Sequence, residues 1–254
     1  MSNQEDIQSL IKMTSIPKGE FVMGAKRFTK GFSHDEVPRH RVEITRSFYV
    51  GTYPVTQQLW ESVTGFNPST HIGENRPVEH VSWFHCIHFC NKLSEKTGKE
   101  VVYTIDSNGV SCNWKARGYR LLTEAEWEYC AKADTKKDTL YYPEKENLYS
   151  GSDTIDEVSW FEENSNNQTH PVGKKNPNNL GLYDMSGNVR EWVWDWYGPY
   201  SKERQLDPRG PLTGKDKVSR GGSYELPANF LRVSNRFRYP PKLSYAPIGL
   251  RIAL

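Results

Sequence analysis

The fold is decided by the stretch Asn179-Leu-Gly-Leu-Tyr-Asp-Met-Ser-Gly-Asn-Val-Arg-Glu-Trp-Val-Trp-Asp-Trp-Tyr197. Trp192, Trp194 and Trp196 alternate with other residues, which is the period of a β-strand and places the three rings on one face. Large aromatic side chains bury much surface, so this strand is expected in the core. A turn-forming run with acceptor side chains comes just before it. Two interpretations stay open: a structural nucleus of core and turn, or a turn whose carboxylates hold a cation.

Composition indicates a loop-rich globular protein held together by aromatic clusters. The 254 residues suffice for one large core; 36% are hydrophobic and 13% are aromatic. The 33 basic and 31 acidic residues give a net charge of +2, which is too balanced to indicate nucleic-acid binding. No apolar run approaches the ~18 residues of a membrane-spanning helix, and the first residues lack the profile of a signal peptide. We therefore expect a soluble protein without a transmembrane segment.

The cysteines are Cys86, Cys90, Cys112 and Cys130, and none of them forms a Cys-x-x-Cys pair. The histidines near the first two do not complete a zinc-binding set. Cys86 and Cys90 are one helical turn apart on an apolar face. Buried free thiols are therefore expected.

Alternating apolar residues predict the strands. Two antiparallel strands are expected within 16–24 and 38–50, joined by a loop near 30–37. A hairpin turn is expected at 106–109 between two short strands. The polar stretch 132–165 is expected to be a long irregular loop.

Capping residues predict the helices. Thr56 is a candidate N-cap for a helix over 57–64. Ser82 is the candidate cap of a second helix, which Gly98 ends. Thr123 and Glu126 form the capping box of a third helix.

The order of the motifs resembles the formylglycine-generating enzyme (sulfatase-modifying factor) family. The matching motifs are Phe21-Val-Met-Gly24, Pro54-Val-Thr56, Pro77-Val-Glu79, Tyr119-Arg-Leu-Leu-Thr-Glu-Ala-Glu-Trp-Glu-Tyr129, Gly181 to Trp192, Arg220-Gly-Gly-Ser-Tyr224 and Gly249-Leu-Arg251. The resemblance implies an α+β fold of the C-type-lectin kind, loop-rich with little regular secondary structure. It covers 16–254 as a single domain, after an N-terminal lead-in over 1–15.

The resemblance also implies where catalytic groups would lie. The family's oxidase uses a C-terminal cysteine pair that binds copper, since thiolates are soft ligands for Cu(I). The corresponding positions are Ala228 and Val233, and no cysteine follows Cys130. Relatives that use iron hold it through histidines, and none follows His170. We therefore predict no catalytic residues, no catalytic cofactor and no enzymatic activity; the alternative is a metal-dependent enzyme of the sulfatase-modifying type with an altered site.

One metal site of the family matches residues of this chain. The oxidase's calcium loop corresponds to the side chains of Asp184 and Glu191 and the carbonyls of Gly187 and Val189. Oxygen ligands that include carboxylates suit a hard cation. The resemblance thus implies a structural calcium ion here, beside the alternative of a turn without a metal.

The C-terminal section, about 220–254, combines a regular framework with large, chemically mixed side chains. In the framework, Arg232 and Arg236 are expected to pair with buried carboxylates such as Glu124 or Glu126. The mixed side chains follow no helix or strand period, and aromatic residues with arginine on loops are typical of an interface hot spot. The residues predicted to contact a ligand are Tyr224, Leu226, Asn229, Phe230, Leu231, Phe237, Arg238, Tyr239, Pro240, Leu243 and Tyr245.

This section is also similar to the variable region of diversity-generating retroelement proteins, in particular the treponemal variable proteins. That similarity implies a diversified C-terminal surface on the same fold, displayed at the cell surface as a receptor or adhesin. We therefore predict a non-enzymatic, monomeric ligand-binding protein whose partner is a protein or another macromolecule. The alternative is an ordinary lectin-type loop region with some exposed aromatic residues.

Overall fold

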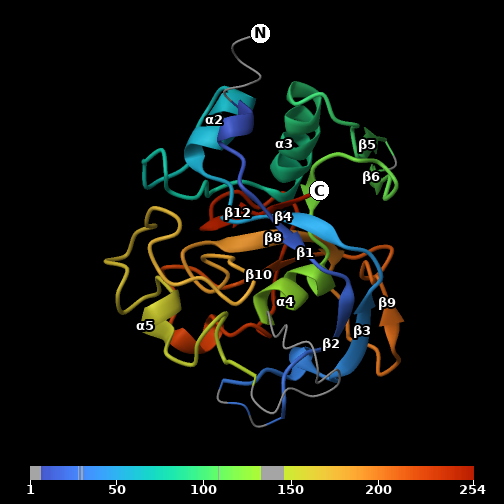
Figure 1. The fold of residues 1–254 in the computed structure, drawn as a ribbon, viewed down its shortest axis with the longest axis vertical. Coiled ribbons are helices and arrows are strands. Elements are labelled where there is room, and N and C mark those ends of the chain that lie inside the picture. Colours follow the sequence, from blue (N-terminus) through green and yellow to red (C-terminus); the bar gives the residue numbers. More distant parts are fainter. Residues whose placement is uncertain (1–6, 28, 30, 108, 133–145) are drawn as a thin grey trace.

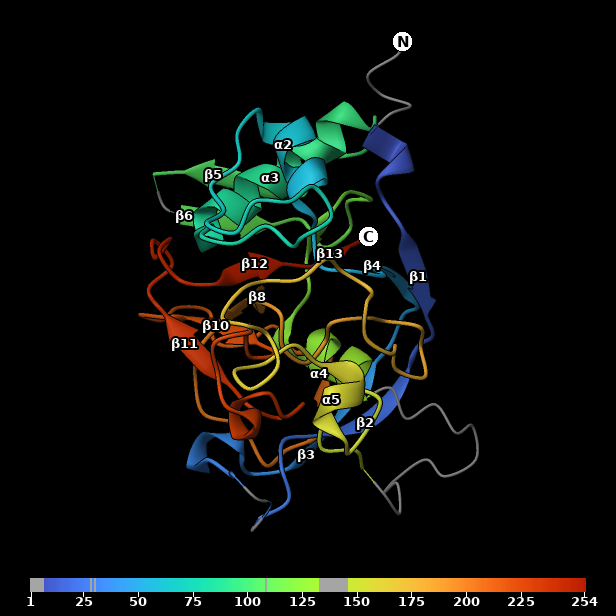
Figure 2. The same ribbon diagram turned by 90° about the vertical axis from the view of Figure 1, so that its left-hand side faces the viewer.

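The computed structural model of the chain describes residues 7–27, 29, 31–107, 109–132 and 146–254. These residues form small sheets and short helices joined by long loops, which confirms the predicted loop-rich α+β class (Figures 1 and 2). Part of the irregular loop predicted at 132–165 lies outside the described residues, at 133–145. Within the described residues, no helix combines the length and the apolar character needed to cross a membrane.

The elements are short throughout. The strands are β1 (Met13–Ile16), β2 (Gly19–Met23), β3 (His40–Ile44), β4 (Phe48–Gly51), β5 (Tyr103–Asp106), β6 (Gly109–Cys112), β7 (Arg120–Leu121), β8 (Arg190–Trp196), β9 (Gln205–Leu206), β10 (Lys217–Arg220), β11 (Phe237–Tyr239), β12 (Ile248–Leu250) and β13 (Ile252–Ala253). The helices are α2 (Gln57–Thr64), α3 (Trp83–Lys96), α4 (Glu124–Lys132) and α5 (Ile155–Val158), with 3-10 turns η1 (His34–Glu36) and η2 (Ala228–Phe230).

The tryptophan stretch forms β8, the inner strand of a sheet with the order β11-β10-β8-β12. β10 pairs with it antiparallel and β12 pairs with it parallel. Trp192 and Trp194 lie in or against one apolar cluster with α2 and α3, whereas Val193 belongs to a second cluster that contains α4. Figure 1 shows α2 and α3 on one side of β8 and α4 on the other. The alternating pattern of side chains therefore correctly predicted the strand. Apolar clusters cover both of its faces.

The predicted helix caps are confirmed. Thr56 and Ser82 each accept a hydrogen bond from the backbone N–H three residues on, at 3.3 Å and 3.1 Å. Thr123 and Glu126 exchange bonds of 3.1 Å and 2.9 Å, which completes the capping box of α4. Gly98, just after α3, has a φ of 70°, the left-handed conformation that glycine adopts at low cost.

The ordered N-terminal part begins earlier than the sequence suggested. β2 and β3 are antiparallel, as predicted, and β5 and β6 form the expected hairpin. However, Ile7 is buried in the first apolar cluster, and β1 begins at Met13 and pairs with β4. The lead-in predicted over 1–15 therefore contains residues that pack onto the domain, which one apolar side chain in a polar run signals only weakly.

Candidate functional site

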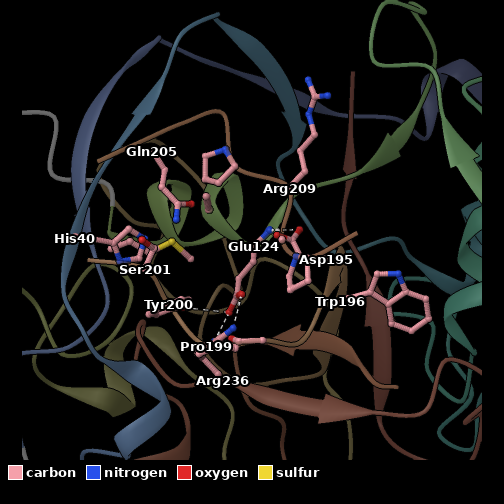
Figure 3. Close-up of a pocket in the computed structure, with 16 residues that line it drawn as sticks. His40, Glu124, Asp195, Trp196, Pro199, Tyr200, Ser201, Gln205, Arg209 and Arg236 are labelled. Atoms are coloured by element: carbon pink, nitrogen blue, oxygen red, sulfur yellow. Dashed lines mark hydrogen bonds and ion pairs between the residues drawn. The ribbon is translucent and has the colours of Figure 1, made fainter. Parts of the chain in front are cut away.

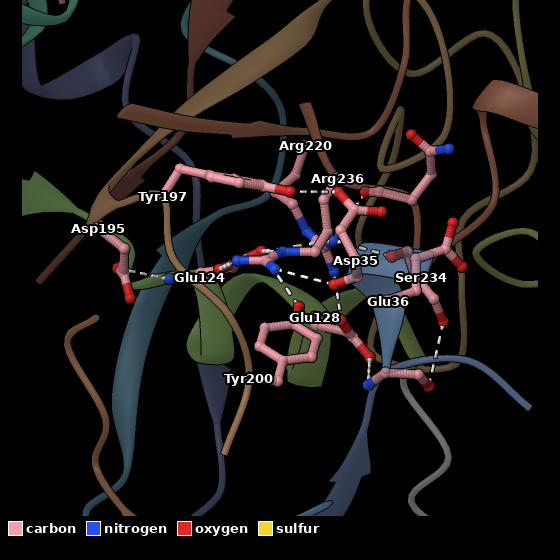
Figure 4. Close-up of polar contacts among 12 residues, drawn as sticks. Asp35, Glu36, Glu124, Glu128, Asp195, Tyr197, Tyr200, Arg220, Ser234 and Arg236 are labelled. Carbon is pink, nitrogen blue, oxygen red and sulfur yellow. Dashed lines mark hydrogen bonds and ion pairs between the residues drawn. The ribbon is translucent and has the colours of Figure 1, made fainter. Parts of the chain in front are cut away.

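Buried arginine–glutamate pairs anchor the C-terminal section to the rest of the fold (Figure 4). Arg220 of β10 donates to Glu128 of α4 and to the carbonyl oxygens of Ser234 and Asn235, at 3.0 Å and 2.7 Å. Arg236 donates to both carboxylate oxygens of Glu124, at 2.6 Å and 2.8 Å. Bidentate pairs of this kind fix geometry. They hold 234–236 against α4 and β10, as predicted for Arg236.

The charge on Glu128 is balanced by its surroundings. Burial disfavours the charged form, but Lys132 at 2.9 Å, Arg220 and the Gly24 N–H at 2.7 Å outweigh burial and hold the pKa of Glu128 at about 2. A buried carboxylate is tolerated when it is paired in this way.

Arg232 pairs with a buried carboxylate, as predicted, but the carboxylate is Glu36 and neither of the two given as examples. Its guanidinium donates to both carboxylate oxygens of Glu36, in η1, at 2.7 Å and 2.6 Å. Glu126 instead binds Arg120, at 2.6 Å and 2.8 Å. Glu126 is held near its own helix by the capping box, so it does not reach the C-terminal section.

Aromatic residues of the C-terminal section surround Arg190 of β8. We call the surface formed by these groups the C-terminal surface; it comprises Arg190, Glu225, Phe230, Phe237 and Tyr239. The Arg190 guanidinium lies 5.5 Å from the Phe237 ring centroid and 5.3 Å from that of Tyr239, and it donates to Tyr239 Oη and Glu225 Oε1, both at 2.8 Å. Phe230 is 39% exposed, and its ring centroid is 6.2 Å from that of Phe237. The result is an aromatic face with a nearly buried cation beneath it.

β11 divides the residues predicted to contact a ligand. Phe237 and Tyr239 lie on the Arg190 side of this strand, whereas the Arg238 guanidinium lies 4.7 Å from the centroid of Tyr197. Successive side chains of a strand point to opposite faces. The structure therefore does not bring Arg238 together with the two aromatic residues.

Leu231 does not belong to an exposed surface, contrary to its prediction as a contact residue. It is fully buried in a third apolar cluster with Tyr149, Val158 and Phe161. An aliphatic residue in a mixed loop gives no period from which its burial could be predicted. Leu231 instead supports the loop from below.

The remaining predicted contact residues differ in exposure. Tyr224 is only 7% exposed and lies edge-on to His71, with ring centroids 5.1 Å apart. Tyr245 is 79% exposed. The other partly buried or exposed residues are Leu226, Asn229, Pro240 and Leu243.

The thiols lie away from this surface. Cys86, Cys90 and Cys130 are buried in the two main apolar clusters, and burial raises the pKa of each. Within the described part of the chain, no group of three or more histidine, cysteine, aspartate or glutamate residues is placed to hold a metal ion.

The turn before β8 satisfies its carboxylates with protein donors. Asp184 accepts bonds from the Gly173 N–H at 2.8 Å and from the Asn188 amide at 3.2 Å, and burial raises its pKa. Glu191 accepts bonds from Arg251 at 2.8 Å and Trp127 at 2.7 Å. A guanidinium thus occupies the place that a cation would take at Glu191. This arrangement differs from the ligand set that the resemblance implies for calcium, which also includes the carbonyls of residues 187 and 189. Calcium binding itself is untested and stays a prediction.

Sequence reasoning missed two functional candidates on β8. Arg190 lies two residues before Trp192, so the alternation of side chains along a strand already places it on the same face as Trp192 and Trp194. Its bond to Tyr239 joins residues 49 positions apart, which no local pattern predicts. Asp195 is buried, and no local pattern in the sequence singles it out.

Comparisons with known proteins agree with this architecture. Residues 1–254 match the family described as the sulfatase-modifying factor enzyme 1-like domain. The chaperone protein LppX of Paenibacillus barcinonensis is 37% identical over 235 residues, which cover 80% of this chain and 76% of the relative. The formylglycine-generating enzyme of Mus musculus is 28% identical over 287 residues, covering 96% and 75%.

Solved structures are similar over nearly the whole chain. Treponema denticola variable protein 1 superposes with a TM-score of 0.85 at 31% identity, covering 96% of this chain and 94% of that one. PvdO from Pseudomonas aeruginosa gives a TM-score of 0.71 at 27% identity, covering 95% and 93%. On the match over its full length, the chain belongs to the family of sulfatase-modifying factor enzyme 1-like domains.

Proposed function

We propose that the chain is a non-enzymatic binding protein that holds another protein on its C-terminal surface. The observation that carries this proposal is the aromatic face of Phe230, Phe237 and Tyr239, set on short elements above the buried Arg190. Rigid aromatic side chains supply contact area at low entropic cost. The arginine–glutamate pairs behind them fix the loops in advance, which reduces the cost of binding.

Three further observations support this function over thiol oxidation. No cysteine follows Cys130, whereas the resemblance places the family's cysteine pair in the C-terminal section, at Ala228 and Val233. The chain is similar to a variable protein over 94% of that protein's length. A relative that is 37% identical is named a chaperone, which favours a polypeptide as the partner. Display at a cell surface and diversification of the C-terminal codons belong to the same proposal.

Binding can be tested without knowing the natural partner. A displayed library of random peptides would be selected on the wild-type protein, and the affinity of the enriched peptides measured. Phe230→Ala with Phe237→Ala should weaken the binding by at least ~30-fold, the equivalent of about 2 kcal/mol. The control is Tyr49→Ala with Phe66→Ala, because these two aromatic residues are about half exposed and lie outside the C-terminal surface.

The outcomes separate the candidates. Loss of binding only in the first double variant, with unchanged melting temperatures, supports the C-terminal surface as the binding site. Equal binding by both double variants contradicts it. Copper or iron bound by the purified protein, together with oxidation of a cysteine-containing peptide, would favour the alternative enzyme.

Diversification has its own test, which is to sequence the gene in many isolates of the source organism. Substitutions should be confined to exposed positions within 229–230, 237–240 and 243–247. Leu231, Arg232 and Arg236 should stay constant, because they are buried in the framework. A near-copy template and a reverse transcriptase gene should lie nearby. An invariant C-terminal section without a template would contradict diversification and leave a binding protein of fixed specificity.

A further inference from the structure

A cavity of about 280 Å³ lies between α4, the end of β8 and the loop that follows it (Figure 3). Its lining includes Glu124 of α4, Asp195 of β8 and Tyr200 of the loop. None of the residues that define the C-terminal surface lines it. Its volume is near the lower end for ligand pockets, so it suits a small molecule.

Asp195 supplies a carboxylate that the described residues only partly satisfy. It is 3% exposed and lines the cavity. Its Oδ2 atom accepts the Glu124 N–H at 2.8 Å, while Oδ1 accepts no hydrogen bond from the described residues. The loop approaches Oδ1 closely at Gly210, where a Cβ atom would stand 3.0 Å from it. Oδ1 is not one of the fully buried side-chain atoms that lack a partner, so it is open to the cavity, where a ligand can donate a hydrogen bond to it.

The other carboxylate of the cavity is already neutralised. Glu124 binds Arg236 through both oxygens, and the Arg220 guanidinium lies 3.6 Å away. Two arginines line the cavity: Arg236, which is bound to Glu124, and Arg209. The Arg209 guanidinium lies 4.2 Å from the Trp114 centroid, and Figure 3 shows it extending away from Asp195. Lys217 of β10 acts on Asp195 from a distance, but Asp195 forms no close ion pair with any described residue.

We infer that this cavity binds a small organic cation whose primary ammonium group pairs with Asp195. An ammonium group donates hydrogen bonds and carries a positive charge, so it can form the close ion pair that Asp195 does not make with the described residues. The walls contributed by Met23, Ala125 and Pro211 suit a short alkyl chain. A hard metal ion would need several oxygen ligands, and one free carboxylate oxygen among apolar walls does not provide them.

The charges around Asp195 give the inference a distinctive pH dependence. Burial and then Glu124 raise the pKa of Asp195 to about 8, with a smaller raising contribution from Glu126 and an opposing one from Lys217 of β10. His40 and Arg209 also line the cavity. An ammonium ligand favours the ionised carboxylate, so binding releases the proton. Affinity should therefore rise about tenfold per pH unit below pH 8 and level off above it.

The test uses calorimetric titration of the full chain with butylamine, and with butanol and butyrate as neutral and anionic analogues of the same length. Butylamine should bind at least ~10-fold more tightly than butanol, and butyrate should not bind. Asp195→Asn keeps the shape and the acceptor for the Glu124 N–H, and it should weaken butylamine at least ~10-fold. Glu203→Gln removes a carboxylate of the same loop that does not line the cavity, so it should have no effect.

Several results would overturn the inference: no binding by any of the three probes, equal binding of butylamine and butanol, or unchanged affinity in Asp195→Asn. A pH-independent affinity between pH 6 and 8 would also contradict it. The melting temperature of Asp195→Asn shows whether that variant is folded. Peptide binding by the C-terminal surface is a separate measurement, so either proposal can fail alone.

Discussion

Arg232 and Glu36 are both buried, and each carboxylate oxygen of Glu36 accepts a hydrogen bond from the Arg232 guanidinium. Removing one member of such a pair strands the other charge in a medium of low polarity. Arg204 makes the opposite case, because it reaches Glu20 and Glu43 from a side chain that is 52% exposed. Water solvates its partners when the arginine is lost. Burial, and not the number of ion pairs, decides the effect of each arginine on stability.

Arg232→Leu should therefore lower the free energy of unfolding by about 3–5 kcal/mol. Arg204→Leu, which removes the same charge from the surface, should change it by no more than about 1 kcal/mol. Urea unfolding of both variants measures the difference. Similar losses in the two variants would show that Glu36 finds another partner or becomes protonated.

At the scale of elements, the acidic side chains of α4 bind the arginines of the C-terminal section. The cap of α4 was predictable because Thr123 and Glu126 are three residues apart, and the same holds for the caps of α2 and α3. The partners of Glu124 and Glu128 were harder to predict, because they lie 112 and 92 residues away in the chain. Several arginines and several carboxylates satisfy the sequence pattern, which is why a buried carboxylate could be predicted for Arg232 but Glu36 could not be singled out. The hydrogen bonds of a helix cap join residues that are close in the sequence, so the sequence predicts them. The ion pairs join distant residues and depend on how the elements are arranged in the folded chain.

Glu128 predicts how stability depends on pH. Its folded pKa of about 2 lies below the ordinary value of 4.5, so its ionised form stabilises the fold above pH ~4.5. That contribution, on the order of 3 kcal/mol, is lost as the pH falls from about 4.5 to about 2. Glu128→Gln should be less stable than wild type at pH 6, and the difference should shrink by pH 3. Urea unfolding at each pH measures it; a constant difference would contradict the pKa.

At the scale of the whole molecule, the aromatic clusters on both sides of β8 were predictable and the sites were not. The three tryptophans required a buried strand, and the family motifs fixed the order of the elements. The cavity beside Asp195 arises where β8, α4 and a distant loop meet, so no single stretch of sequence describes it. The same is true of the C-terminal surface, where Arg190 and Tyr239 meet across two strands.

The turn before β8 gives a prediction for the intact protein. Since Arg251 already pairs with Glu191, the melting temperature should be the same in EDTA and in millimolar calcium, within about 1 °C. An increase with calcium that Asp184→Asn abolishes would establish the calcium site that the family resemblance implies. Magnesium at equal concentration controls for ionic strength.

β12 and β13 lie after the C-terminal surface in the chain, yet β12 pairs with β8 and β13 bridges β4 and β7. The two four-stranded sheets are thus completed by strands that leave the ribosome after the surface does. A surface sequence that disturbs the path from β11 to β12 would leave β8 with an open edge, which is recognised by chaperones and proteases. Under the diversification proposed above, each new version of the surface would then pass a quality-control step before it meets any partner. Variants in which β12 and β13 fail to pair would be removed by chaperones and proteases. Variants whose changes are confined to contact residues would fold and remain.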